Sequence, residues 1–258
     1  SRVTPVFSMS DIHIVALLSI VAFASFTHGF SGFGYGILFM AITSFMVDDI
    51  ERPSVFVTVS GFTLLGILIA RSWREIRLDW KGVGLVFVGM IVGIPLGYAC
   101  VAAWGAVVQF RIVFGLALIG FALYGFFKPH VRKHIPAIWA PVFGLASGLL
   151  GGMFSSGGPP LVLYAYARED DPRMAIGSLQ VLMIVGAIYK LGVVSAGPKG
   201  VAELWIPALF AAPVIVAFAL SGFALARKVT AKTFVKVVYA LLMAAGLMNV
   251  AKGIGVWS

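Results

Sequence analysis

The chain of 258 residues is 60% hydrophobic and only 11% charged, a composition that excludes an ordinary soluble domain and is typical of a polytopic membrane protein. Its net charge of +9 does not indicate a nucleic-acid partner, because the basic residues lie in short loops between apolar runs, where they set topology and contact lipid headgroups. One cysteine and four scattered histidines exclude an internal disulfide and a Cys/His metal cluster, and the sequence indicates no cofactor.

Apolar stretches follow one another in a repeated order. The first, residues 12–47, is far longer than the roughly 20 residues that cross a bilayer, and it is interrupted by the cluster Phe30-Ser31-Gly32-Phe33-Gly34-Tyr35-Gly36. Three uninterrupted spans follow, and after a basic loop the order begins again with residues 138–167, interrupted by Phe154-Ser155-Ser156-Gly157-Gly158-Pro159-Pro160. The uninterrupted spans are residues 55–70, 83–101 and 112–127 in the first half and residues 174–194, 204–226 and 235–250 in the second.

The two interrupting clusters can be laid on each other, with Gly34 on Gly158. A pair of Gly/Pro-broken apolar segments at corresponding places in two halves indicates a transporter with its substrate site near the bilayer midplane. We therefore predict an all-α polytopic membrane protein that is an inverted repeat, each half having a broken or hairpin segment and three transmembrane helices. The first repeat is residues 9–127, the second (inverted) repeat is residues 136–252, and residues 128–135 form a basic cytoplasmic linker.

The positions of the 19 Lys and Arg residues bear on whether each broken segment crosses the membrane or returns as a hairpin. If the segments cross, the 19 basic residues divide almost evenly, 8 against 11. If they are hairpins, 13 of the 19 fall on one side and six on the other, namely Arg2, Arg52, Arg111, Lys190, Lys199 and Lys252. The positive-inside rule favours the hairpins. Each half then makes an odd number of passes, the second half is inverted, and both termini are expected on the outer, periplasmic side.

The two hairpin tips are the expected substrate site. Irregular backbone at membrane depth is tolerated only where it is buried in protein or lines an aqueous cavity. The short helices predicted to follow the breaks direct free N–H groups and a positive dipole end at the tips. Ser31, Ser155 and Ser156 add hydroxyl donors. Together these groups are suited to holding a small anion mainly by neutral donors.

Close helix packing is the other common role of glycine in membrane helices. It is the favoured interpretation for Gly89, Gly93 and Gly97, which share one face of their span. At the two clusters, glycine, serine and tandem proline together would break a helix, so there we favour the binding tip over packing alone.

Polar side chains inside the spans are further candidates, because such residues are expensive in a bilayer and are functional by default. His28 precedes the first tip and either contacts the anion or carries a proton, or is hydrogen-bonded between helices. Gln180 with Ser178, and Thr58 in the other half, either complete the pocket or make interhelical hydrogen bonds. Lys190 lies near the outer end of its span, where it either snorkels to the surface or supplies a counter-charge for the substrate.

Acidic runs with an Arg/Pro pair follow both hairpins, at residues 48–53 and 169–173. Their simplest role is to cap the next helix with an aspartate near its N-terminus. The alternative is a salt bridge that gates the site.

The segment 144–161, GLASGLLGGMFSSGGPPL, followed by a short helix and an acidic turn, resembles the second-repeat signature of the TauE/SafE family of sulfite and organosulfonate exporters. Residues 29–36 look like its glycine-rich first repeat, with Phe33 and Tyr35 where small residues are more usual; these rings would narrow the site or stack against an organic substrate. The resemblance spans essentially the whole chain. It implies a bacterial inner-membrane permease that exports sulfur-containing anions, with a binding region of Phe30, Ser31, Gly32 and Gly34 together with Ser155, Ser156, Gly157, Gly158 and Pro159.

The resulting hypothesis is a secondary transporter of sulfite or organosulfonates that binds its anion between the two tips. No enzymatic activity is expected, because the spans offer no convergent nucleophile, acid/base pair or metal set. A permease or importer for a small carboxylate or other anion, and a non-transporting membrane assembly subunit, are the alternatives. The expected partners are a small anion and membrane lipid, without nucleic acid, and a homodimer is left open. The candidate substrate-binding residues are His28, Phe30, Ser31, Gly32, Phe33, Gly34, Ser155, Ser156, Gly157, Gly158, Pro159 and Gln180.

Overall fold

The computed structural model describes residues 14–32, 34–47, 49–72, 78–127, 135–168, 172–197, 200–226, 228 and 231–255. All regular structure within these ranges is helical, with no strand. Six of the helices described there are long and apolar enough to cross a membrane. The prediction of an all-α polytopic membrane protein is therefore confirmed.

The helices follow the order of the predicted apolar stretches. The first half consists of α1 (Ile14–Ser31), α2 (Tyr35–Thr43), α3 (Glu51–Ser72), α4 (Trp80–Trp104) and α5 (Phe110–Phe127). The second half consists of the 3-10 turn η1 (Ala137–Trp139), α6 (Ala140–Phe154), α7 (Gly158–Arg168), α8 (Pro172–Ser195), the 3-10 turn η2 (Ala202–Leu204), α9 (Trp205–Ala226) and α10 (Ala231–Gly253). Each predicted break separates two helices, α1 from α2 and α6 from α7. The predicted linker lies almost wholly outside the described residues.

Backbone conformation explains where the two breaks occur. Gly32 and Gly34 have φ values of 81° and 107°, a left-handed conformation that glycine adopts without a steric penalty. At the second break Ser155 takes this conformation, with φ of 53°, as the C-cap of α6. Pro159 stands in the first turn of α7, where the missing N–H would have had no helical partner.

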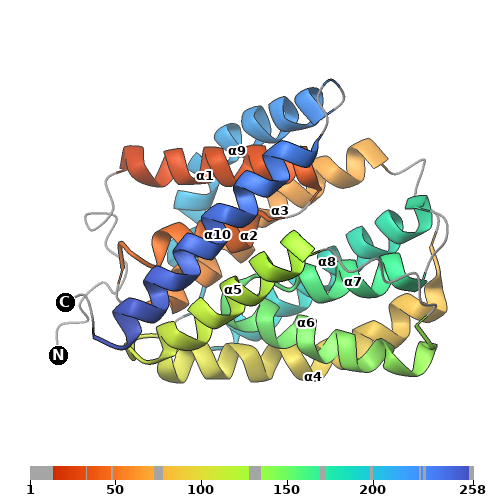
Figure 1. Cartoon of the computed structure of the whole chain (residues 1–258), viewed down its shortest axis with the longest axis horizontal. Coiled ribbons are helices and arrows are strands. Elements are labelled where there is room, and N and C mark those ends of the chain that lie inside the picture. The colour runs from red at the N-terminus through yellow and green to blue at the C-terminus, as the bar shows by residue number, and fades with distance from the viewer. Residues whose placement is uncertain are drawn as a thin grey trace.

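Both broken segments return instead of continuing across the bundle. Near the start of α6, Gly144 lies against Val86 of α4, and at the end of α7, Arg168 pairs with Asp79, the N-cap of α4. The end of α7 therefore lies at the same end of α4 as the start of α6. In Figure 1, α2 likewise turns back along α1, and the two helices pack together.

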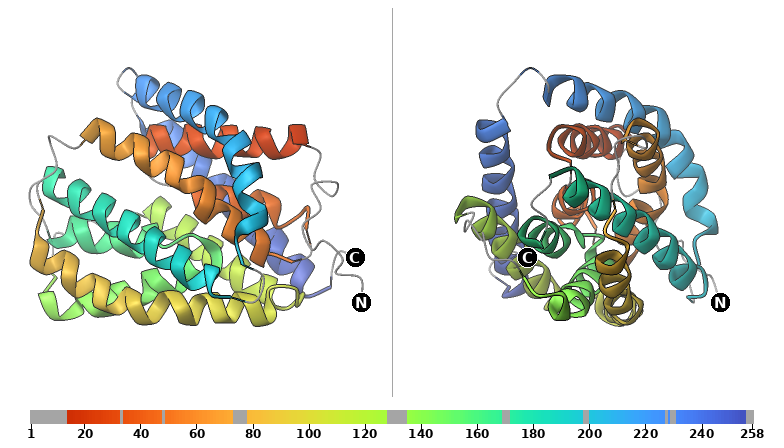
Figure 2. Two further views of the ribbon diagram at one scale, coloured as in Figure 1. Left: turned by 180° about the vertical axis from the view of Figure 1, so that it is seen from behind. Right: turned by 90° about the vertical axis from the view of Figure 1, so that its right-hand side faces the viewer.

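Contacts between the two halves form a reciprocal set. The most extensive pairings join α4 with α6, α5 with α10 and α1 with α9. Helices α1 to α5 of the first half correspond in order to α6 to α10 of the second. If each helix is replaced by its counterpart, the α4–α6 pairing becomes α9–α1 and the α4–α8 pairing becomes α9–α3. Both of these pairings are present. The first turn of α1 and the last turn of α10 lie at the same end of the bundle (Figures 1 and 2). These pairings support the duplicated plan; the inverted relationship and the repeat boundaries stay predictions.

Backbone contact between α4 and α6 is made by glycine. A β-carbon added to Gly93 would overlap backbone atoms of Leu145 and Gly148, and Gly89 and Gly97 face α6 in the same way. The packing role predicted for these three glycines is thus confirmed. At the α1–α9 interface a β-carbon on Gly29 or Gly222 would likewise overlap the backbone of the facing helix.

The C-terminal end of α2 is fixed by buried polar groups of α5 and α10. Arg111, which is 2% exposed, donates hydrogen bonds from its guanidinium group to the carbonyl oxygens of Ser44 and Val47. The side-chain amide of Asn249 donates to the Ser44 hydroxyl at 3.0 Å. A cation at a helix C-terminus also complements the negative end of the helix dipole. The first hairpin is therefore anchored to the α5–α10 pair.

Candidate anion-binding site

A cavity of about 140 Å³ lies between the two breaks. Since a water needs roughly 10–15 Å³ of such space, the cavity can hold a ligand of several non-hydrogen atoms. Seven predicted site residues from both tips line it: His28, Gly34, Ser155, Ser156, Gly157, Gly158 and Pro159. The fold thus brings together two clusters that are more than a hundred residues apart in the sequence. Tyr35, Thr58 of α3, Ser147 of α6 and Lys190 of α8 add further polar groups to the lining.

The two tips contact each other directly. A β-carbon on Gly36, in the first turn of α2, would overlap the backbone carbonyl of Ser155. The Ser155 hydroxyl donates to the carbonyl oxygen of Ser54 in α3 at 2.7 Å and lies 3.4 Å from the Thr58 hydroxyl. Ser155 therefore links the second tip to α2 and α3 of the first half.

Lys190 extends its side chain toward the second tip instead of the surface. Its Nζ donates to the hydroxyl of Ser155 at 2.7 Å, to the carbonyl oxygen of Gly151 at 2.8 Å and to the hydroxyl of Ser54 at 3.0 Å. The residue is only 4% exposed, so the snorkelling alternative is wrong. All three ammonium protons are bonded to neutral oxygens, and within the described residues no carboxylate pairs with this lysine.

His28 is oriented by the backbone of its own tip. Its Nδ1 accepts a hydrogen bond from the Tyr35 N–H at 3.4 Å, which places the proton of the neutral imidazole on Nε2. Nε2 is buried and has no hydrogen-bond partner among the described residues, and His28 lines the cavity. The Tyr35 hydroxyl, in turn, is within 2.8 Å of the Ser60 hydroxyl. The imidazole is therefore a preoriented donor.

Backbone donors at the tips are fewer than two helix N-termini would ordinarily supply. Proline has no N–H, so Pro159 and Pro160 remove two donors from the first turn of α7. In α2 the N–H of Tyr35 is directed to His28, which leaves those of Gly36 and Ile37 without an intrahelical partner. Side chains must accordingly provide a larger share of the contacts to a bound ligand.

Four predicted site residues do not line the cavity. Phe30 stacks on Phe26, with ring centroids 6.3 Å apart, and the Ser31 hydroxyl donates to the Thr27 carbonyl at 2.7 Å. Gly32 forms the turn after α1. Gln180 is buried in α8, ten residues before Lys190.

Phe33, also predicted for the site, lies outside the described residues, as do most of the acidic run at 169–173 and the histidines at 130 and 134. In the other acidic run, a carboxylate oxygen of Asp49 accepts a hydrogen bond from the Glu51 N–H at 2.9 Å. The capping role predicted for this run is therefore confirmed at α3.

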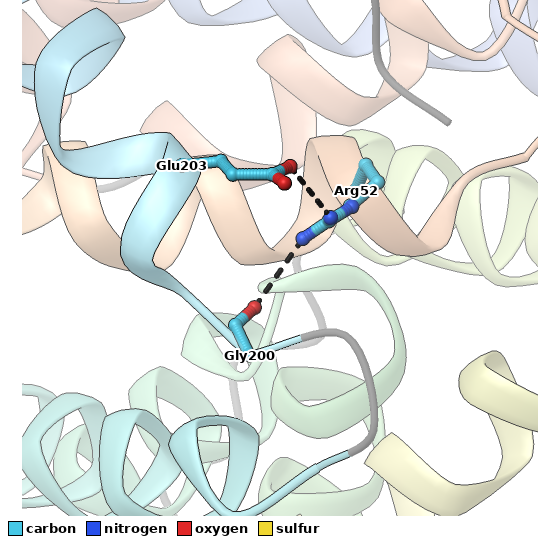
Figure 3. Close-up of polar contacts among 3 residues, drawn as sticks. All are labelled: Arg52, Gly200 and Glu203. Carbon is cyan, nitrogen blue, oxygen red and sulfur yellow. Dashed lines mark hydrogen bonds and ion pairs between the residues drawn. The ribbon is translucent and has the colours of Figure 1, made fainter. Parts of the chain in front are cut away.

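Ion pairs join the two halves at opposite ends of the bundle. At one end Arg52, at the start of α3, donates to Glu203 at 3.0 Å and to the carbonyl oxygen of Gly200 at 3.3 Å (Figure 3). At the other end Arg168 pairs with Asp79 at 3.0 Å. Each pair connects the junction that follows one hairpin to the segment that precedes the fourth helix of the other half, α9 for Arg52 and α4 for Arg168. Arg52 belongs to the first acidic run, whereas Arg168 lies just before the second. Gating by these ion pairs stays a prediction.

Comparisons with known proteins identify the family of the chain. The family model described as "Sulfite exporter TauE/SafE" matches residues 17–249. A curated protein of Cupriavidus necator, named "Probable sulfite/organosulfonate exporter TauE", is 22% identical over 248 residues, which are 95% of this chain and 96% of that protein. No solved structure matches the chain. Because the family model covers nearly the whole sequence, including both tips and all the helices that line the cavity, the chain belongs to the sulfite exporter TauE/SafE family.

Proposed function

We propose that the protein is a secondary transporter that exports small sulfur-containing anions, such as sulfite or organosulfonates, across the bacterial inner membrane. The observation that carries this proposal is the cavity between the two breaks, which lies where a broken-helix transporter places its substrate. The family of the chain supports the substrate class. The predicted orientation, with both termini periplasmic, and the absence of an enzymatic activity belong to the same proposal.

The anion is held by donors that converge on the cavity. The Nε2–H of His28 and the N–H groups of Gly36 and Ile37 supply neutral donors from the first tip, while the second tip supplies the positive dipole end of α7. Such preoriented groups replace the hydration shell of the anion without needing to reorganise. The two ion pairs at opposite ends then mark the places where the path to the site opens and closes.

The driving force for export can come from the membrane potential alone. Moving one elementary charge across 100 mV is worth about 2.3 kcal/mol, which corresponds to roughly fifty-fold accumulation. With the cytoplasm negative, this potential drives a net negative charge outward. Export of a monoanion therefore needs no coupling ion.

Flux measurements in proteoliposomes test the proposal. Vesicles loaded with an organosulfonate, sulfite or a matched carboxylate are given an inside-negative potential, and efflux is followed. We expect efflux of the sulfur-containing anions and its loss in the Gly158→Leu protein, because position 158 lines the cavity and has open space beside it. Gly192→Leu is the matched control, since this glycine of α8 is exposed and also has open space beside it.

The outcomes separate the alternatives. Efflux of carboxylates alone would make the protein an organic-acid carrier. Absence of flux for every anion, in a protein that is folded and inserted, would favour a non-transporting membrane subunit. Undiminished transport by the Gly158→Leu protein would contradict the location of the site between the tips.

A further inference from the structure

We infer that Lys190 determines the charge selectivity of this site and that its ammonium group binds the oxyanion head of the substrate. Because Lys190 is the one Lys or Arg among the described residues that line the cavity, the site takes monoanions. This inference rests on the proposed function and deepens it. It assigns the binding charge to α8, whereas the predicted site drew its donors mainly from the two tips.

The surroundings of Lys190 are unusual for a buried cation. A charged side chain inside a membrane protein normally pairs with a carboxylate, because removing an ion from water is expensive. Here the three partners of Nζ are the neutral oxygens of Ser54, Gly151 and Ser155. They satisfy the hydrogen-bonding capacity of the ammonium group without cancelling its charge. An anion in the cavity would supply the missing compensation.

The geometry fixes the ammonium group at the cavity wall. Lys190 and Ser155 both line the cavity, whereas Ser54 does not and is 1% exposed. The hydroxyl of Ser54 therefore accepts a hydrogen bond from Nζ on the side away from the cavity. The carbonyl oxygen of Gly151, which also accepts from Nζ, belongs to the last turn of α6, at the negative end of that helix dipole. An anion in the cavity would take one of the three Nζ protons in place of a neutral oxygen.

The remainder of the lining argues for a single negative charge. Much of it consists of apolar side chains, including those of Val57, Leu64, Met90, Ile94 and Met183. A dianion would leave one negative charge without a partner among these side chains, and such a charge is strongly disfavoured. A monoanion with a short apolar substituent, by contrast, places its head at Lys190 and its substituent against the apolar wall.

A purely structural role for Lys190 is the competing explanation. In that case the lysine only ties the end of α6 to α3, and its replacement lowers the stability of the protein without changing its response to anions. The inference predicts the opposite pattern. Removing a buried charge whose partners are all neutral leaves no uncompensated charge behind, so stability without ligand is maintained or increased, whereas the response to anions is lost.

The experiment is ligand-dependent thermal stabilisation of the detergent-purified protein, with methanesulfonate as the monoanion, sulfate as the dianion and dimethyl sulfone as the neutral analogue. The wild-type protein should respond to methanesulfonate only. In Lys190→Gln the affinity for methanesulfonate should fall by roughly 30-fold or more, the usual loss when one partner of a buried charge pair is removed. Lys190→Arg keeps the charge and should keep a measurable response. Lys252→Gln, near the end of α10 and away from the cavity, is the matched control.

The outcomes are distinguishable from failure of the proposed function. If the wild-type protein responds to no anion, the proposed function itself fails. If it responds to methanesulfonate and Lys190→Gln responds equally, the function stands and the role of Lys190 is overturned. Equal stabilisation of the wild-type protein by sulfate and methanesulfonate overturns the selectivity for monoanions without any variant, so the inference remains testable even if Lys190→Gln does not fold.

Discussion

Contact between the two tips can be tested by a single added methyl group. In Gly36→Ala the new β-carbon would overlap the backbone carbonyl of Ser155, which cannot rotate away as a side chain can. Overpacking of this kind costs about 1–3 kcal/mol. Alanine also has a more favourable helix propensity than glycine, by up to about 1 kcal/mol. The two effects on stability oppose each other, so Gly36→Ala needs a matched control. Gly61→Ala in α3 gains the same propensity and has open space beside it.

The difference in stability between the two variants measures the steric clash, because both variants gain the same helix propensity. For a protein of this size each kcal/mol corresponds to roughly 2–4 °C, so Gly36→Ala should melt about 2–12 °C below Gly61→Ala in the same detergent. Differential scanning fluorimetry on the purified proteins is sufficient for this comparison. If the two melting temperatures coincide, the tips are not in backbone contact, and the shared cavity loses one of its supports.

Substitutions at two further positions address the anchor of the first hairpin and the role of the Ser155 hydroxyl. Arg111→Met removes the donors to the buried carbonyl oxygen of Ser44 and the part-buried carbonyl oxygen of Val47. Loss of the buried bond alone should destabilise the protein by about 1–3 kcal/mol, measured as a loss of melting temperature and of monodisperse protein. Ser155→Gly and Ser155→Ala both remove the acceptor of the Lys190 ammonium group and should weaken anion binding alike. Residue 155 has a left-handed backbone conformation, which glycine adopts without a steric penalty and alanine does not. Ser155→Ala should therefore be the less stable of the two by about 1–2 kcal/mol.

Matched controls are available for both. Gln109→Met changes an exposed residue just before α5 and should leave the melting temperature unchanged; a similar result for Arg111→Met would mean that the buried guanidinium is not an anchor. Ser19→Ala removes a hydroxyl of α1 that donates to the Val15 carbonyl at 2.7 Å and belongs to a residue that does not line the cavity. Anion binding by the Ser155→Ala protein as strong as that by the Ser19→Ala protein would contradict the assigned role of Ser155.

Local features of the sequence were sufficient to predict the helices and the breaks. Long apolar runs predict the spans, and glycine, serine and tandem proline gathered in two clusters predict the breaks. The meeting of the tips was predicted from the duplicated plan, and the residues at 155–159 do line one cavity. The substrate-binding role of these residues stays a prediction.

Side-chain directions were harder to predict, because they depend on helical phase and on partners far away in the chain. Phe30 is two residues beyond His28, which places it on the opposite face of α1, against Phe26. Gln180 is ten residues before Lys190, or about 15 Å along α8, too far to share its cavity. The position of Lys190 was the least predictable, since its partner Ser54 is 136 residues earlier in the chain and only the folded structure brings them together.

The glycine contacts between α4 and α6 and between α1 and α9 have a consequence for how the protein can move. Helices whose backbones touch lose many close contacts on separation, and each of these pairs takes one helix from each half of the sequence. These contacts argue against the two sequence halves as the rigid bodies of the proposed transport cycle. We expect mixed blocks that carry α6 with α4 and α1 with α9. If one half were expressed alone, the glycine-lined faces of its helices would lie against lipid. If the two halves were expressed as separate chains, we expect that neither would fold stably until it had packed against the other.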